Sequence, residues 1–170
     1  LAVLYTSRNI VRLIDVALDH DPPYFVMEYL ENGSLAQRLE RGRLPVDDAV
    51  RIARAMAQAL VHAHGSGVLH CDLKPANVLF DAGGDPRLCD FGQSRLSSER
   101  TPALGTLFYM APEQAVLDGI PDARWDVYAL GALLYQMLTG TAPRRNTGNE
   151  ETLQRATTTE ERLTAYRRLL

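Results

Sequence analysis

Apolar residues recur at every third or fourth position between Pro45 and His64, and polar residues form the opposite stripe. The apolar stripe is Ala49, Ile52, Ala53, Met56, Leu60 and Ala63, and the polar stripe is Asp47, Arg51, Arg54, Gln58 and His62. This spacing predicts an amphipathic helix with one buried face. Pro45 suits the start of such a helix and Gly65 suits its end.

Shorter apolar runs flank this helix. Residues 10–18, "IVRLIDVAL", and 24–30, "YFVMEYL", are rich in β-branched and aromatic side chains, and "DHDPP" lies between them. This arrangement predicts a β-hairpin. Residues 35–40 predict a short helix, and the runs between 68 and 90 predict loops and small strands.

The remaining pattern is simpler. Residues 125–139, "WDVYALGALLYQMLT", are apolar on all sides, which predicts a helix inside the core, ended by Gly140. Residues 93–110 have no period and predict a mobile segment. Residues 144–170 are strongly charged and predict about one solvated helix, with helical spacing at Leu163, Tyr166, Leu169 and Leu170.

Composition limits the classes of function. The 170 residues are 46% apolar and 23% charged, as in a soluble globular domain, and the net charge of −3 argues against nucleic acid or an anionic membrane as partner. Cys71 and Cys89 form no Cys-x-x-Cys pair, so we expect neither disulfides nor zinc, and a reducing cytoplasm. No apolar run reaches the roughly 20 residues of a membrane span. The first residue is not methionine, which indicates a fragment.

Three motifs follow one another in a fixed order. Asp72, Lys74 and Asn77 stand in "HCDLKPANVLF" at 70–80, "DFG" follows at 90–92 and "APE" at 111–113. In this order they resemble the catalytic half of the protein kinase superfamily, in the style of bacterial members, over about residues 5–143. The implied fold is α+β, mainly α. Residues 1–30 would be the last small-lobe strands and the joining segment, 31–143 the large lobe, and 144–170 a partial end of that lobe.

The resemblance implies a role for each motif residue. Asp72 would orient the hydroxyl of a protein substrate, and Lys74 would neutralise charge on the moving phosphoryl group. Asn77 and Asp90 would hold Mg²⁺, which prefers oxygen ligands. Thr106 would brace Asp72 and Lys74. Lys74 and Thr106 are the serine/threonine-kinase version of the pattern, which implies transfer from ATP to a serine or threonine of a protein.

The resemblance also assigns contacts with the nucleotide. These residues are Met27, Glu28, Leu30, Ser34, Leu79 and Cys89. The backbone of Glu28 and Leu30 would bind adenine, with Met27 behind it and Leu79 beneath it. Cys89 would pack as a small apolar residue, although a reactive thiol stays open.

Several neighbouring residues are expected to have structural roles, and for Asp126 and Glu113 it is the resemblance that implies them. His70 would pack under Phe91, and His64 would be structural as well. Asp126 would hold the backbone of the catalytic loop through its carboxylate. The resemblance would pair Glu113 with a distant arginine, and we expect Glu113 to be without that partner in this chain.

The chain departs from the kinase pattern in two ways. Cys71 stands where many kinases carry an arginine for a phosphorylated activation segment, so we expect alanine at Ser97, Ser98 and Thr101 to leave most activity in the parent enzyme. The 26 residues before Met27 contain no glycine, and Lys74 is the only lysine. A glycine-rich loop and an ATP-clamping lysine are therefore lacking, and we expect the fragment alone to be close to inactive.

Two other functions stay open. The first is a pseudokinase or scaffold, favoured by the lacking lysine and opposed by the intact Asp72, Lys74, Asn77 and Asp90. The second is a small-molecule phosphotransferase of the aminoglycoside type, although those enzymes generally lack Lys74 and the "APE" segment. The resemblance implies a cytoplasmic domain with no membrane contact of its own, in a parent that can be tethered to the membrane elsewhere.

Overall fold

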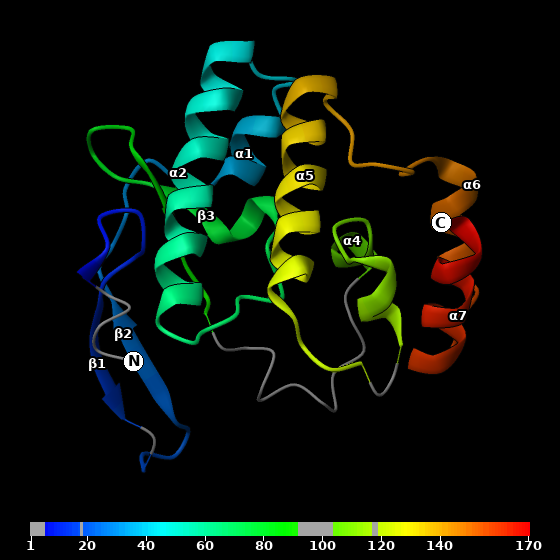
Figure 1. Cartoon of the computed structure of the whole chain (residues 1–170), viewed down its shortest axis with the longest axis horizontal. Coiled ribbons are helices and arrows are strands. Elements are labelled where there is room, and N and C mark those ends of the chain that lie inside the picture. Colours follow the sequence, from blue (N-terminus) through cyan, green and yellow to red (C-terminus); the bar gives the residue numbers. More distant parts are fainter. Residues whose placement is uncertain (1–5, 18, 92–103, 117–118) are drawn as a thin grey trace.

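The computed structural model describes residues 6–17, 19–91, 104–116 and 119–170 (Figure 1). Its strands are β1 (Leu13–Ala17), β2 (Tyr24–Met27), β3 (Val78–Phe80) and β4 (Pro86–Leu88). Its α-helices are α1 (Leu35–Leu39), α2 (Val46–Gly65), α4 (Leu104–Leu107), α5 (Ala123–Thr139), α6 (Thr147–Gln154) and α7 (Thr159–Leu169). Two 3-10 turns, η2 (Pro75–Asn77) and η3 (Pro112–Ala115), complete the order.

Helices α2 and α5 pack side by side at the centre of the molecule (Figure 1). The residues that fill this core from the two helices include Ile52, Met56, Ala59, Leu133 and Met137. The predicted amphipathic helix is confirmed as α2, since its apolar stripe is buried, apart from the half-buried Ala53, and Asp47, Arg51, Arg54 and Gln58 are exposed. Burial of this stripe is what keeps the helix in place, because each fully buried large apolar side chain contributes about 1.5–3 kcal/mol.

The prediction that residues 125–139 are buried on all sides is wrong. One stripe of α5 faces solvent, with Val127 62% and Tyr135 50% exposed and Gly131 exposed between them. The opposite face of the helix packs against α2 and the rest of the core. A uniformly apolar sequence cannot indicate which side of a helix its neighbours leave uncovered.

The predicted hairpin is present but shorter than expected. Strands β1 and β2 are antiparallel, with Leu13 opposite Met27 and Ala17 opposite Tyr24, so the second strand ends before Leu30. The preceding segment joins a different sheet, because Ile10 bridges Leu88 of β4. Strands β3 and β4 form a second antiparallel pair, which confirms the small strands expected between residues 68 and 90.

The charged tail forms two helices rather than one. Asn146 caps α6, and Thr158 caps α7 in a capping box with Glu161. The tail is not simply solvated either, since Tyr166 is 1% exposed and its hydroxyl donates to the carbonyl of Met110 at 2.5 Å. Within the described part of the chain, no helix is long and apolar enough to cross a membrane.

Candidate active site

The loop between α2 and β3 is anchored by one buried carboxylate. Asp126, at the start of α5, is fully buried and accepts hydrogen bonds from the backbone N–H of His70 (2.9 Å) and Cys71 (2.7 Å). His64 at the end of α2 lies 2.7 Å from the same carboxylate through Nε2. A buried carboxylate is stable only when it is fully partnered. Asp126 therefore holds the loop backbone, as expected.

His70 is a structural residue that joins the loop to β4. Its fully buried ring contacts Phe91 edge-on at 4.8 Å, as predicted. Nε2 donates to the carbonyl of Cys89 (2.9 Å), and Nδ1 accepts from the N–H of Asp72 (3.2 Å). Burial lowers the pKa of His70, so the ring is neutral in this position. The segments that carry Asp72 and Asp90 are thus bound to one ring.

Two residues at this site have a left-handed backbone. Cys71 has φ of 61° and Asp90 has φ of 63°, a region that residues other than glycine rarely adopt. The Cys71 peptide is fixed on both sides, by Asp126 at its N–H and by Gln114, whose amide donates to its carbonyl at 2.7 Å. Strain of this kind persists where the surroundings enforce it, which is common at functional sites. No sequence signal indicated it.

The predicted catalytic residues gather at the open end of the β3–β4 hairpin. Lys74 Nζ lies 2.7 Å from Asp72 Oδ2, and the amide nitrogen of Asn77 donates to the carbonyl of Asp72 at 2.9 Å. Asp90 follows Cys89, whose N–H donates to the carbonyl of Asn77 at 2.9 Å. The structure therefore brings Asp72, Lys74 and Asn77 into direct contact and places Asp90 beside them.

The predicted adenine contacts lie where β2 ends. The N–H of Glu28 donates to the carbonyl of Arg12 (3.0 Å), and its carboxylate accepts from the N–H of Arg12 and from Arg87, both at 2.9 Å. Among the described residues, neither the carbonyl of Glu28 nor the backbone of Leu30 has a hydrogen-bond partner. Half-buried Met27 is the last residue of β2. The Glu28–Arg87 ion pair was not predicted, because it joins residues 59 positions apart.

Leu79 and Ser34 are neighbours across an isolated antiparallel bridge. Leu79 belongs to β3 and is half-buried. The Ser34 hydroxyl accepts from the N–H of Gln37 (3.3 Å) and caps α1, in a capping box with the Gln37 side chain. Ser34 is thus first a helix cap, and its contact with a nucleotide stays a prediction.

A model of the protein kinase domain matches residues 1–168 of the chain. The chain belongs to the protein kinase domain family. Over 143 residues it is 40% identical to serine/threonine-protein kinase PknL of Mycobacterium tuberculosis, covering 81% of this chain and 36% of PknL. Over 141 residues it is 36% identical to serine/threonine-protein kinase PrkC of Bacillus subtilis, covering 79% of this chain and 22% of PrkC. A rice protein, CBL-interacting protein kinase 19, is 37% identical over 151 residues, or 84% of this chain and 30% of that protein.

The structure also describes three further residues that were assigned roles from the sequence, Cys89, Thr106 and Glu113. Cys89 is 5% exposed, and burial raises the pKa of its thiol to about 12, so the thiol is not reactive at neutral pH. Thr106 lies in α4 and is half-buried, and within the described residues it forms no hydrogen bond to Asp72 or Lys74. Its bracing role stays a prediction. Glu113 is exposed and has no ion pair among the described residues.

Some of the kinase-domain residues named from sequence lie outside the described residues. These are Gly92 of the "DFG" motif and Ser97, Ser98 and Thr101. The predicted mobile segment at 93–110 is described only from residue 104, where α4 begins. The chain spans 22–36% of the length of the three relatives above.

Proposed function

We propose that this kinase domain transfers the γ-phosphoryl group of ATP to a serine or threonine hydroxyl of a protein substrate. The observation that carries the proposal is the 2.7 Å contact between Asp72 and Lys74, in a loop that Asp126 anchors at two backbone N–H groups. Phosphoryl transfer requires positioning and charge compensation more than covalent chemistry from the protein. The names of the three relatives, two of which are serine/threonine-protein kinases, support it.

Asp72 and Lys74 have different roles in the proposed reaction because they carry opposite charges. The Asp72 carboxylate can accept a hydrogen bond from the substrate hydroxyl and orient its oxygen for attack on the phosphorus. Lys74 holds that carboxylate through one contact and keeps further N–H donors for oxygens of the transferred phosphoryl group. The side chains are 19% and 27% exposed, so both can be reached by a substrate.

The oxygen donors at the end of β3 and β4 suit a magnesium ion. The amide nitrogen of Asn77 is engaged by the carbonyl of Asp72, which leaves the amide oxygen as the ligand, and Asp90 supplies a carboxylate. Among the described residues, no cluster of three or more His, Cys, Asp or Glu side chains could hold a metal. Two protein oxygens agree with Mg²⁺, which usually binds one or two side chains together with water and substrate phosphates. When bound, it would neutralise charge on the phosphates of ATP.

The joining segment supports the adenine end of the proposal. The N–H of Glu28 is already bonded to the carbonyl of Arg12. The groups that could bind the edge of adenine are therefore two acceptors, the carbonyls of Glu28 and Leu30, and one donor, the N–H of Leu30. Leu79 would lie beneath the ring. Cys71 and Cys89 are both buried, and a location in a reducing cytoplasm is part of the proposal.

A binding role without transfer is the second candidate. Under this candidate, a protein with Asn at position 72 would perform as well as the natural one.

The test is transfer of radiolabel from ATP to a generic basic protein. We would compare the complete gene product, its Asp72→Asn variant and the 170-residue chain, with exposed Asp19→Asn as the matched control. Loss of the orienting carboxylate should lower the rate about 10²-fold or more, while Asp19→Asn leaves it unchanged. Equal labelling by Asp72→Asn would remove Asp72 from its role and favour the scaffold.

A further inference from the structure

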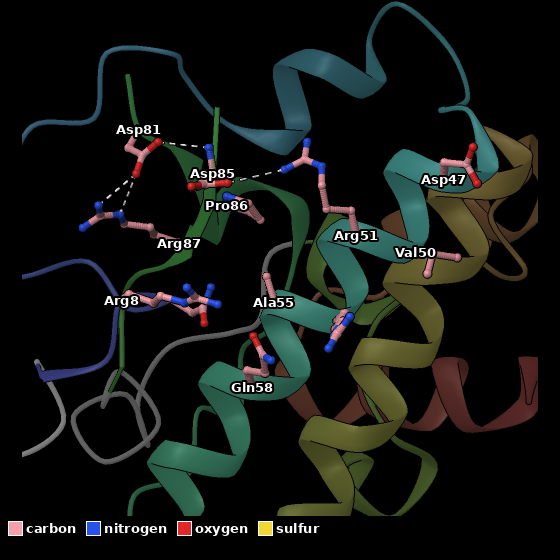
Figure 2. Close-up of a pocket in the computed structure, with 12 residues that line it drawn as sticks. Arg8, Asp47, Val50, Arg51, Ala55, Gln58, Asp81, Asp85, Pro86 and Arg87 are labelled. Atoms are coloured by element: carbon pink, nitrogen blue, oxygen red, sulfur yellow. Dashed lines mark hydrogen bonds and ion pairs between the residues drawn. The ribbon is translucent and has the colours of Figure 1, made fainter. Parts of the chain in front are cut away.

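A polar cavity of about 600 Å³ lies along the exposed face of α2 (Figure 2). Three parts of the chain form its walls: residues 8–9, the exposed face of α2 between 47 and 58, and the β3–β4 turn with β4 between 81 and 87. None of Asp72, Lys74, Asn77 or Asp90 lines it. It therefore borders the turn of the β3–β4 hairpin, whereas the kinase site lies at the hairpin's open end.

Some of the charges around this cavity are already neutralised and hold its wall. Arg87 donates to Asp81 through Nε (3.1 Å) and Nη2 (2.8 Å), and Asp81 also accepts from the N–H of Asp85 at 2.9 Å. Arg51 crosses from α2 to the turn, where it donates to the carbonyl of Gly84 (3.3 Å) and lies 3.9 Å from Asp85 (Figure 2). These contacts fix the turn against the helix.

Two cations remain. Arg8 and Arg54 are exposed, and within the described part of the chain neither forms an ion pair or a side-chain hydrogen bond. In Figure 2, Arg8 extends from the N-terminal segment towards α2, on the side where Gln58 projects. Asp47 is the one acidic lining residue without an ion pair among those described, and it lies at the far end, at the first turn of α2 (Figure 2).

Apolar groups complete the lining. Val50 is 55% exposed and, with Ala55 and Pro86, gives the cavity a surface for hydrocarbon. A guanidinium group without a partner favours a carboxylate or phosphate. A volume of about 600 Å³ exceeds what one small anion needs and lies within the usual range of ligand pockets.

We propose that this cavity binds an acidic peptide segment of a protein partner. Arg8 and Arg54 would contact its carboxylates, Gln58 would donate to its backbone, and Val50 would pack against an apolar side chain of the peptide. The site is separate from the phosphoryl-transfer site, and the proposal does not depend on catalysis.

The test uses a short peptide of glutamate and leucine that carries an uncharged dye, and its glutamine-for-glutamate counterpart. Fluorescence anisotropy would measure binding to the 170-residue chain. We expect the glutamate peptide to bind, and the double variant Arg8→Gln/Arg54→Gln to weaken binding about tenfold or more. The matched control, Arg167→Gln/Arg168→Gln, removes the same charge from the exposed face of α7 and should leave the affinity nearly unchanged.

Two further measurements make the result specific. Val50→Glu places a negative charge on the cavity wall and should also weaken the glutamate peptide, whereas Asp72→Asn should not. Equal affinity for Arg8→Gln/Arg54→Gln and for its control would overturn the proposal. So would equal binding of the glutamine peptide, or displacement by inorganic phosphate at a lower concentration than by unlabelled peptide, which would indicate a small-anion site.

Discussion

At the scale of single residues, His70 couples the site to pH. Its ring is fully buried and neutral, and burial lowers its pKa below the ordinary value of 6.5. In the unfolded chain the same ring takes up a proton below about pH 6.5, so the unfolded state binds more protons there. Stability is therefore complete above that pH and is lost as the pH falls towards the lowered pKa.

We expect the free energy of unfolding, measured with urea, to fall between about pH 6.5 and pH 5, before most carboxylates titrate. His70→Phe keeps a ring beside Phe91 but cannot titrate. It should be less stable at pH 7.5 by about 1–3 kcal/mol, because Cys89 and Asp72 each lose a hydrogen bond, yet depend less on pH. An unchanged slope in the variant would assign the pH dependence to other groups.

The sequence was most informative about residues that are close along the chain. Asp72, Lys74 and Asn77 lie within six positions, and their order with "DFG" and "APE" was enough to predict a kinase site. The left-handed backbone of Cys71 and Asp90 was not predicted, because cysteine rarely adopts it and aspartate, although it does so more often than most residues, adopts it too seldom to indicate a particular position. Contacts such as His64 with Asp126, 62 positions apart, depend on how α2 and α5 meet.

At the scale of elements, the hydrophobic pattern predicted where helices occur better than it predicted which of their faces are buried. Helix α2 was predicted to within one residue at each end, since its period repeats over five turns. The position of helix α5 was predicted correctly, but its exposed face was not, because its sequence has no polar stripe. The two tail helices were missed as separate elements, although Asn146 and Thr158 are recognisable caps.

A hydrogen bond from Tyr166 joins helix α7 to the segment that follows α4. Tyr166 donates from its buried hydroxyl to the carbonyl of Met110, which precedes the "APE" motif. Tyr166→Phe keeps the ring and leaves that carbonyl without its partner, so we expect a loss of about 1–2 kcal/mol in the free energy of unfolding. The control is Tyr29→Phe, because Tyr29 is 89% exposed and its hydroxyl should contribute almost nothing. Equal effects in the two variants would mean that the contact with Met110 does not stabilise the domain.

At the scale of the whole molecule, burial is uneven. The core between α2 and α5 is filled, while the β1–β2 hairpin projects at one end of the described structure (Figure 1). Consecutive residues of β2, Tyr24, Phe25 and Val26, are 45%, 54% and 40% exposed, so both faces of this strand are open. Two-stranded sheets are marginal alone, and exposed apolar strands tend to pair with other chains.

We therefore expect the 170-residue chain to self-associate through this hairpin as its concentration rises. Ile14→Thr with Phe25→Thr removes the two most exposed apolar groups of the β1–β2 hairpin and puts in their place a residue that suits strands. Sedimentation velocity should show less association, with a melting temperature close to that of the natural chain. The control, Val61→Thr with Val127→Thr, changes apolar residues of α2 and α5 that are somewhat more exposed than the hairpin pair. If this control lowers association as much as the hairpin variant, then association is a general effect of apolar surface and the hairpin is not its site, because only a specific strand contact depends on which residues are replaced.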